Sequence, residues 1–445
     1  MDISEIRITI KKLLREQTPD KEQYEEALPL CEELWKVFPS THEFWDVYQY
    51  AYCLKRLNKL DEAEIICNRI YFDFKDSDMT PEQSRAFAYI KNLYAWIIND
   101  KYIKSIRNSD YLHMKSVLDK LILLHELINQ NESNAPSFPY CALTALNQMT
   151  KIDTSIDYEK FLRVLNYLDP TLLSLEVRQF TDSSGKIREI ASQKETFYKL
   201  KSDALLKTNR NEECILCCNE AMDMLDHFHY GNDVWFARKI AIALGKLGNI
   251  DDAIKKLEKL IVISDKWFLL YEIGKFYLQL NKQRALEYML RAACTKDPEK
   301  MKVSLIESLG DLFNEIGEKS LAQDNYLFAR QIRLSNNWTI RDQLNRKIVT
   351  EREVTFKEIR KDWIKKIYEL IGSKNGKVTK LFPNKTGGFI QADESYYFQF
   401  KNFFGKSNLL KVGDKVEFVI TTSYDRKKRV ETEEAIVITP INNKN

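Results

Sequence analysis

The residues best suited to binding chemistry lie near the C-terminus, where aromatic and basic side chains alternate along short extended segments. One segment runs from Gly376 to Phe382 and another from Tyr396 to Phe400. Aromatic rings can stack on nucleobases while ammonium groups contact the phosphates. The candidate nucleic-acid-binding residues are Lys377, Lys380, Phe382, Lys385, Phe389, Tyr397, Gln399, Phe400, Phe404, Lys406, Arg426, Lys427, Lys428 and Arg429. This pattern indicates a surface for single-stranded nucleic acid.

The same segments also fit a barrel that contacts only proteins. Aromatic-rich small barrels serve as interaction modules, and a basic cluster such as Arg426–Arg429 keeps a sheet edge soluble at a hairpin tip. Side chains alternate along a strand, so Tyr397 and Gln399 should face one way and Tyr396 and Phe398 the other. One pair is expected to build the core, which leaves the other pair for the surface.

A cysteine-rich segment is the second arrangement that resembles a chemical site. Cys214, Cys217 and Cys218 precede His227 and His229, as in half of a metal site. A structural zinc ion needs four ligands. However, Cys214 and Cys218 occupy packing positions of a repeat helix, where a cysteine behaves as a small apolar side chain. We therefore expect these cysteines to pack in the core and expect no metal.

Catalytic motifs are incomplete. His125-Glu126 begins like a zinc-binding helix but lacks its second histidine. Gly405-Lys-Ser407 ends like a phosphate-binding loop, but Phe400 stands where the first glycine is needed. We expect a protein that is not an enzyme and uses no cofactor. An enzyme with its catalytic residues within 80–190 is the less favoured alternative.

Composition limits the elements that could position these residues. The chain has 445 residues, 44% hydrophobic and 30% charged, which is typical of a soluble protein with more than one domain. With only 13 glycines and 10 prolines, long helices are favoured over a many-stranded sheet. Membrane-spanning and signal-peptide patterns are not apparent, and eight cysteines are too few for a disulfide framework. We expect a cytoplasmic protein.

Charge is distributed unevenly along the chain. Residues 338–445 contain 22 lysines and arginines against 14 aspartates and glutamates, a net charge of +8. The whole chain carries only +3, so residues 1–337 carry −5. Long-range attraction to phosphate should therefore act at the C-terminal end.

Helical repeats precede the basic end. In the clearest unit, small residues at Gly310, Ala322 and Ala329 let two helices approach, and large residues such as Tyr326 fill the remaining space. Equivalent positions recur at Ala27, Ala63, Ala253 and Ala285. The pattern resembles the tetratricopeptide repeat (TPR), and it predicts a TPR-like α-solenoid over residues 1–337. Within it, 80–190 should be irregular, and Trp35, Trp45, Tyr48 and Tyr52 are interpreted mainly as core.

A long capping or linker helix is expected over 338–371, followed by a hinge at Gly372–Gly376 and a barrel over 372–445. The fold class is therefore mostly α, with a TPR-like α-solenoid followed by a small five-stranded OB or cold-shock-like β-barrel.

The C-terminal segment resembles a cold-shock domain, which is a five-stranded OB-type barrel. Gly376–Ile390 is similar to its first strand and first RNA-binding motif, Tyr396–Phe400 to the second motif, and Val412–Phe418 to the entry into strand four. Lys380 stands where the family has a surface tryptophan, and Gln399 stands where it has a histidine. The resemblance implies nucleic-acid binding, to RNA more than DNA, with a reduced stacking surface.

Together these features predict a non-catalytic adaptor. Its repeats would hold one or more protein partners, and its barrel would bind single-stranded nucleic acid. Such combinations resemble accessory proteins of prokaryotic conflict and mobile-element systems. The alternative is a purely protein-binding scaffold or regulator, in an antiphage or conflict system, with the barrel as an interaction module. The sequence names neither the partner nor the oligomeric state.

Overall fold

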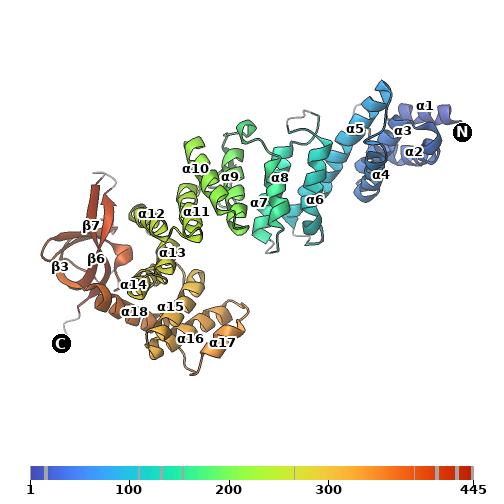
Figure 1. Cartoon of the computed structure of the whole chain (residues 1–445). Coiled ribbons are helices and arrows are strands. Elements are labelled where there is room, and N and C mark those ends of the chain that lie inside the picture. Colours follow the sequence, from blue (N-terminus) through green and yellow to red (C-terminus); the bar gives the residue numbers. More distant parts are fainter. Residues whose placement is uncertain are drawn as a thin grey trace. The chain divides into compact units, whose positions relative to one another are not determined.

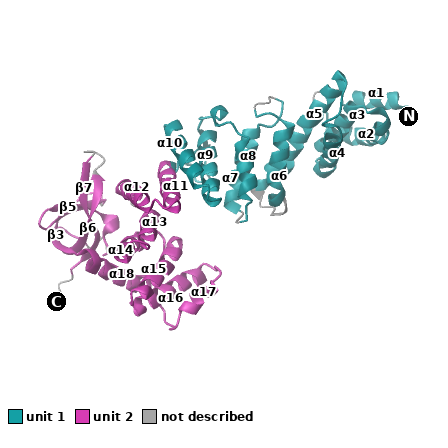
Figure 2. Cartoon of the chain, in the orientation of Figure 1, with its two compact units in different colours: residues 1–232 teal, residues 233–445 magenta. Residues whose placement is uncertain are grey.

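The computed structural model describes residues 2–14, 19–108, 111–130, 134–152, 155–264, 266–384, 386–405, 410–425 and 430–441. Its elements follow the order in Figure 1, from helix α1 to strand β7. The chain forms two compact units, residues 1–232 and 233–445, which are coloured separately in Figure 2. Among the described residues, we find no helix with the length and apolar character needed to cross a membrane.

Unit 1 (residues 1–232) consists of helices that pack mainly against their neighbours in sequence. They are α1 (Ile3–Leu13), α2 (Lys21–Thr41), α3 (Phe44–Arg56), α4 (Leu60–Phe74), α5 (Pro81–Ile98), α6 (Tyr111–Leu127), α7 (Phe138–Ile152), α8 (Tyr158–Asn166), α9 (Gln193–Lys207) and α10 (Asn211–Met224). Helix α3 packs on α2, α4 and α5, which is the arrangement of stacked helical hairpins. The predicted positions Ala27 and Ala63 are fully buried. The TPR-like prediction is confirmed here.

The described part of the predicted irregular region contains four departures from regular α-helix. Helix α5 continues into a π-helical turn, η1 (Asn99–Ile103), and a short 3₁₀ segment, η2 (Ser105–Asn108). A second 3₁₀ turn, η3 (Pro170–Leu172), precedes an antiparallel hairpin of β1 (Arg178–Thr181) and β2 (Ile187–Ile190). The hairpin has no clear sequence signal, because its four-residue strands are exposed on both faces and lack an alternating apolar pattern.

Unit 2 (residues 233–445) begins with further helical hairpins. Its helices are α11 (Asn232–Lys246), α12 (Ile250–Ile263), α13 (Trp267–Tyr277), α14 (Lys282–Ala293), α15 (Val303–Glu315), α16 (Lys319–Ser335), α17 (Asp342–Lys347) and α18 (Phe356–Ile371), with a 3₁₀ turn η4 (Glu299–Lys302). Gly310 shows why the repeat pattern needs a glycine. A Cβ atom there would lie 2.5 Å from Tyr326 Cε1, so only glycine lets α15 approach α16 this closely.

The segment between repeats and barrel differs from the expected single helix. Two helices, α17 and α18, occupy it, and residues 348–355 between them are not helical. Thr355 caps α18, since its side chain accepts the Glu358 backbone N–H while the Glu358 carboxylate accepts the Thr355 N–H. The prediction of a hinge at Gly372–Gly376 is also wrong in part, because Lys374–Gly376 pair with Phe418–Val416 as part of strand β3. Mixed charge and few helix breakers do not reveal this interruption.

The C-terminal strands form a closed barrel in the order β3–β4–β5–β7–β6. They are β3 (Lys374–Leu381), β4 (Gly387–Gln391), β5 (Ser395–Gln399), β6 (Lys415–Asp425) and β7 (Val430–Pro440), with a 3₁₀ turn η5 (Phe400–Asn402). Strands β5 and β7 pair in parallel, and the other described strand pairs of the barrel are antiparallel. A five-stranded Greek-key barrel of this kind is the OB-type architecture that the sequence predicted.

Apolar side chains fill the interior of the barrel, and a glycine lets two of its strands approach closely. Val378, Ile390, Tyr396, Phe398 and Phe418 fill its interior. The prediction that the two pairs face opposite ways is confirmed, and the structure shows that Tyr396 and Phe398 are the core pair, since they are 3% and 0% exposed. At Gly388, a Cβ atom would lie 2.1 Å from the backbone oxygen of Lys380, so β3 and β4 can pair this closely only through glycine.

Within unit 2 the barrel packs directly on the helices. Val419 and Val437 of the barrel share an apolar core with Trp363 of α18 and with residues of α12 to α16. The Tyr368 hydroxyl of α18 lies 2.6 Å from the backbone oxygen of Val437 and 2.9 Å from Thr439 Oγ1. The barrel therefore packs as an integrated part of unit 2, and α18 contacts it directly.

Candidate nucleic-acid interface

Three aromatic rings gather on the outer face of strands β4 and β5 and the end of β3. The ring centroids of Phe382 and Tyr397 are 6.2 Å apart with planes inclined by 27°, and Phe389 lies 5.8 Å from Phe382 and 6.0 Å from Tyr397. Phe389 and Tyr397 are direct cross-strand partners, so their side chains emerge on the same face. All three are half-buried, which leaves part of each ring available for stacking. We call this set the barrel rings.

A β-bulge brings a lysine beside the barrel rings. The register of β3 against β4 shifts between Val378 and Lys380, so Val378 points into the core while Lys380 is exposed opposite Phe389. A bulge inserts one extra residue and re-aims the side chains that follow it. Lys377, also exposed, lies one step earlier on β3 opposite Gln391. Two predicted cations therefore stand on the strand next to the rings.

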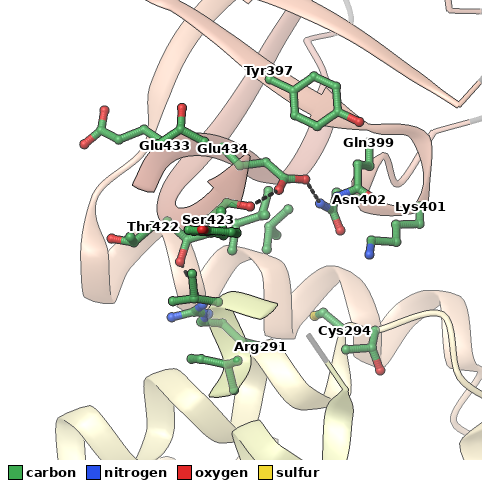
Figure 3. Close-up of a pocket in the computed structure, with 18 of the residues that line it drawn as sticks. Arg291, Cys294, Tyr397, Gln399, Lys401, Asn402, Thr422, Ser423, Glu433 and Glu434 are labelled. Carbon is green, nitrogen blue, oxygen red and sulfur yellow. Dashed lines mark hydrogen bonds between the residues drawn. The ribbon is translucent and has the colours of Figure 1, made fainter. Parts of the chain in front are cut away.

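The barrel rings form one wall of a groove of about 840 Å³ that we call the barrel groove (Figure 3). The opposite wall comes from helices of the same unit: Ile261, Val262 and Ile263 of α12, Leu270 of α13, Arg291 of α14, and Cys294 and Thr295 that follow α14. Strands β6 and β7 and the turn η5 supply the floor, including Thr421, Ser423, Lys401, Asn402 and Glu434. The site is thus composite, built by barrel and repeat helices together.

The groove contains charges of both signs. Arg291 donates from Nη2 to Thr421 Oγ1 at 2.9 Å and lies 3.3 Å from a Glu287 carboxylate oxygen. Glu434 is only 4% exposed, and its carboxylate accepts from Asn402 Nδ2 at 3.1 Å and from Ser423 Oγ at 2.9 Å (Figure 3). Burial, and secondly the negative charge of Glu434, raise the pKa of Tyr397. Tyr397 therefore remains a neutral hydroxyl at physiological pH.

The other predicted residues are distributed differently. Gln399 lines the groove opposite Gly387. Phe400 packs its ring against Phe398 at 5.7 Å, beside the barrel core and not on the face of the barrel rings. Phe404 lines the groove, but its backbone N–H donates to Ile438 and its ring lies 5.4 Å from the Arg360 guanidinium. Lys385, Lys406, Arg426, Lys427, Lys428 and Arg429 lie outside the described residues.

The cysteine-rich segment serves packing, as predicted. Cys214 and Cys218 are fully buried in α10, and Cys214 Sγ lies 3.5 Å from the backbone oxygen of Ser202 on α9. His229 instead places Nδ1 2.6 Å from the buried carboxylate of Glu195. His125 stacks on the Tyr167 ring at 3.9 Å. Within the described ranges, no group of three or more potential metal ligands comes together.

A second aromatic surface lies in unit 1, where the sequence analysis expected core. Tyr48 and Tyr52 of α3 and Tyr89 and Trp96 of α5 line a groove of about 610 Å³, the repeat groove. The rings of Tyr48 and Tyr52 are 5.8 Å apart and nearly parallel, and Tyr89 and Trp96 are 45% and 38% exposed. Burial, with neighbouring tyrosines, raises the pKa of Tyr48 to about 12.

The interpretation of Trp35, Trp45, Tyr48 and Tyr52 as core is therefore corrected, because all four are only half-buried. Spacing along α3 contains the signal that was missed. Phe44, Val47, Ala51 and Leu54 are buried at helical spacing and form the packed face. The same spacing recurs one residue later at Trp45, Tyr48, Tyr52 and Lys55. A shift of one residue turns these side chains about 100° around the helix from the packed face. All four therefore flank the core, and Tyr48, Tyr52 and Lys55 line the repeat groove.

Comparisons with known proteins give fold resemblance only. No protein-family description and no curated protein sequence matches this chain. Similar solved structures include a Rap protein complexed with Competence and Sporulation Factor (14% identity, 66% of this chain and 77% of that one, TM-score 0.31). A tetratricopeptide repeat protein from Parabacteroides merdae is 12% identical over 68% of this chain and 96% of its own, with TM-score 0.27. The human IFIT1 dimer with m7Gppp-AAAA is 13% identical over 83% of this chain and 86% of its own, with TM-score 0.33. The assignment of a TPR-like helical-repeat architecture with a C-terminal barrel rests on the helix pairs and strand order of this chain itself.

Proposed function

We propose that this protein is a non-catalytic adaptor whose barrel groove binds single-stranded nucleic acid and whose repeats bind a protein partner. One observation carries the nucleic-acid part, namely the three barrel rings on one face with exposed Lys377 and Lys380 beside them. Bases would stack on the rings while the backbone passes the lysines. RNA is favoured over DNA because of the cold-shock resemblance. The combination of TPR-like repeats with such a barrel suggests a role in a prokaryotic conflict or mobile-element system.

The composite wall of the groove favours a single strand over a duplex. A groove of about 840 Å³ has room for a few unpaired nucleotides, and α12 and α14 stand opposite the rings, where a second strand would need to lie. Unit 2 also carries the favourable charge. It contains 39 lysines and arginines against 28 aspartates and glutamates, a net +11. Attraction to phosphate therefore acts on the unit that holds the rings.

Fluorescence anisotropy of the full-length protein with labelled single-stranded oligonucleotides tests this function. We expect binding at low salt that weakens as salt rises. Phe389→Ala combined with Tyr397→Ala should reduce affinity roughly 100-fold, because each ring supplies on the order of 1.4 kcal/mol of stacking. Tyr48→Ala combined with Tyr89→Ala in the repeat groove is the matched control and should change affinity less than about two-fold.

Two results would contradict the proposal. Wild-type protein that binds no oligonucleotide at low salt would exclude the nucleic-acid function. Equal affinity of the Phe389→Ala/Tyr397→Ala variant and wild type would move the binding surface away from the barrel rings. Circular dichroism of each variant confirms that the fold is retained.

The repeat groove supports the proposal that the repeats bind a protein partner. Taken alone, it also supports the alternative function of a purely protein-binding scaffold. Unit 1 carries 29 lysines and arginines against 37 aspartates and glutamates, a net −8, which disfavours nucleic acid there. Its tyrosine hydroxyls and the Asn92 amide can hydrogen-bond a peptide backbone while the rings contact apolar side chains. Co-purification of a partner should fail for Tyr48→Ala/Tyr89→Ala and persist for Tyr140→Ala, an exposed tyrosine of α7 outside the groove. Equal recovery by all three proteins would place the partner elsewhere.

A further inference from the structure

Two cations lie where the helices of unit 2 meet the chain that follows strand β5. Lys296, in the loop after α14, donates from Nζ to the backbone oxygen of Phe400 at 2.8 Å. Arg360 of α18 places its guanidinium 5.4 Å from the centroid of the Phe404 ring. Both cations therefore contact the segment 400–404, although they are 64 positions apart in the sequence. We call Lys296 and Arg360 the helix-side cations.

Stacking on aromatic rings, and not an ion pair, holds Arg360 in place. Its guanidinium lies 4.8 Å from the centroid of the Phe356 ring and 5.4 Å from that of Phe404, which lines the barrel groove. Stacking uses the face of the guanidinium and leaves the N–H groups, which lie in its plane, able to donate. Among the described residues, no hydrogen bond or ion pair engages these N–H groups. Arg360 is thus oriented and still able to bind an anion.

Lys296 also keeps donors for a ligand. An ammonium group has three N–H donors, and the bond to the oxygen of Phe400 uses one of them. Its side chain is exposed at the surface. Partial burial, and secondly the positive charge of Arg360, lowers the pKa of Lys296, so the two like charges are close enough to repel each other. An anion bound between them would relieve that repulsion.

The acidic side chains nearest in sequence are directed to another lysine. Asp297 and Glu299 follow Lys296 in the same loop. Burial lowers the pKa of Lys302, and the charges of these two carboxylates oppose that decrease. Within the described part of the chain, neither carboxylate forms an ion pair with a helix-side cation. The helix-side cations therefore provide a local excess of positive charge.

The barrel rings lie between the helix-side cations and the two exposed lysines of β3. Strand β4 lies next to β3, and β5 with Tyr397 lies next to β4. Lys296 contacts the chain at Phe400, three residues beyond Tyr397, which is about 10 Å at the rise of an extended strand. Cys294, two residues before Lys296, lies on the helical wall across the groove from Tyr397 in Figure 3. A strand stacked on the rings can therefore reach cations in both directions.

We propose that Lys296 and Arg360 form a phosphate-binding site for the backbone of the bound single strand, so that the strand continues from the barrel rings across the helices of unit 2. This inference rests on the proposed nucleic-acid function and goes beyond it by adding a contact site outside the barrel. A guanidinium binds two phosphate oxygens at once, while an ammonium group acts as a point charge. A phosphodiester would lie between the two cations while a neighbouring base stacks on Tyr397.

Substitutions that remove the two charges test this site. The probe is a labelled oligouridine RNA of about 16 nucleotides, the upper end of what one OB-type barrel covers, and it is titrated with the full-length protein at several salt concentrations. Lys296→Gln combined with Arg360→Gln should weaken binding about ten-fold at low salt. The slope of log affinity against log salt should fall by about 1.4, since each phosphate contact to a single strand contributes about 0.7.

Lys300→Gln combined with Lys361→Gln is the matched control. It removes the same charge from exposed positions in the same loop and on the same helix. Both the affinity and the salt slope of this control should stay close to those of wild type. Lys296→Gln alone alters an exposed side chain with a single hydrogen bond, so it keeps the test valid where the double variant does not fold. It should weaken binding about three-fold.

A second probe separates the strand from a free anion. Sodium tripolyphosphate presents phosphate groups without bases, and calorimetric titration measures its binding. We expect wild-type protein to bind the RNA more tightly than tripolyphosphate, because only the RNA also stacks on the barrel rings. Loss of tripolyphosphate binding in Lys296→Gln/Arg360→Gln with unchanged RNA affinity would overturn the proposal, since the site would then take a free anion and not the strand.

The remaining outcomes separate the two levels of the argument. Equal RNA affinity and salt slope in wild type, the double variant and the control would overturn the phosphate site and leave binding by the barrel rings intact. No binding of RNA by wild-type protein would refute the proposed function, and the phosphate site for the strand with it.

Discussion

Each unit carries a groove lined by aromatic side chains, and the two grooves differ in backbone and in charge. The repeat groove places Tyr48, Tyr52, Tyr89 and Trp96 along two helices of a unit with net charge −8. The barrel groove places Phe389 and Tyr397 on neighbouring strands and Phe382 just after the end of a third, in a unit with net charge +11. Aromatic residues alone do not separate a nucleic-acid surface from a protein surface, because rings stack on bases and pack on apolar side chains equally well.

The two grooves also differ in how their charged side chains are arranged. In the repeat groove Lys55 is held by Asp100 at 2.8 Å, so its charge is compensated locally. In the barrel, exposed Lys377 and Lys380 lie beside the rings. A strand whose bases stack on the rings and whose phosphates contact these lysines matches that arrangement. A peptide with a neutral backbone matches the repeat groove better.

The largest effect is expected from Gly388→Val, which should destroy the barrel groove and leave the repeat groove intact. Any Cβ at this position meets the backbone oxygen of Lys380 at 2.1 Å, so β3 and β4 cannot keep their pairing. We expect a loss of about 3 kcal/mol in stability of the barrel. Oligonucleotide binding by anisotropy should be abolished, and limited proteolysis should cut unit 2 before unit 1.

Thr379→Val is the control, because Thr379 is exposed on β3, the strand that pairs with the strand of Gly388. It should leave both binding and the proteolysis pattern unchanged. Retained oligonucleotide affinity in Gly388→Val would show that binding does not depend on the barrel.

An intermediate effect is expected from reversing the charge beside the barrel rings. Lys377→Glu combined with Lys380→Glu should weaken oligonucleotide binding about ten-fold and lower the slope of log affinity against log salt by about two, because two phosphate contacts are lost. Anisotropy titrations at several salt concentrations measure both quantities.

Lys36→Glu combined with Lys115→Glu changes the net charge of the protein equally, but at exposed positions in unit 1. An equal loss of affinity in this control would mean that only the overall charge matters. The comparison between the grooves would then lose its electrostatic basis.

The smallest effect is expected from pH. All five histidines of the chain lie in unit 1, at positions 42, 113, 125, 227 and 229. Burial lowers the pKa of His125, which stacks on Tyr167, so folding favours its neutral form. The unfolded chain then binds more protons, and this contribution is present above pH about 6.5 and is lost as pH falls through the folded pKa.

Thermal unfolding between pH 7 and pH 5 measures this contribution. His125→Gln should reduce the fall in Tm of the unit 1 transition by on the order of 1–2 °C. His227→Gln, at an exposed position, should leave the fall unchanged. An unaltered fall in His125→Gln would assign the pH dependence to other groups.

The sequence alone predicted the type of each element wherever local periodicity was strong. Alanines and glycines at repeat spacing identified the helical hairpins, because only small residues allow helices to approach as α15 and α16 do at Gly310. Alternation along Tyr396–Gln399 predicted that one pair of side chains enters the barrel core, and the structure shows that this pair is Tyr396 and Phe398. The prediction of a single helix over 338–371 is wrong. The interruption between α17 and α18 contains no proline or glycine, so the local sequence gives no strong signal for it.

Which surfaces the side chains build was decided by tertiary structure. Local pattern located Phe389 and Tyr397, but only the packing of the barrel on α12 and α14 turned their face into one wall of a groove. Glu434 joined them through the β5–β7 pairing, which links residues 37 positions apart. Tyr48 and Tyr89 meet because α3 packs on α5. Residue periodicity reports which side of an element is buried, whereas a binding site depends on contacts between distant elements.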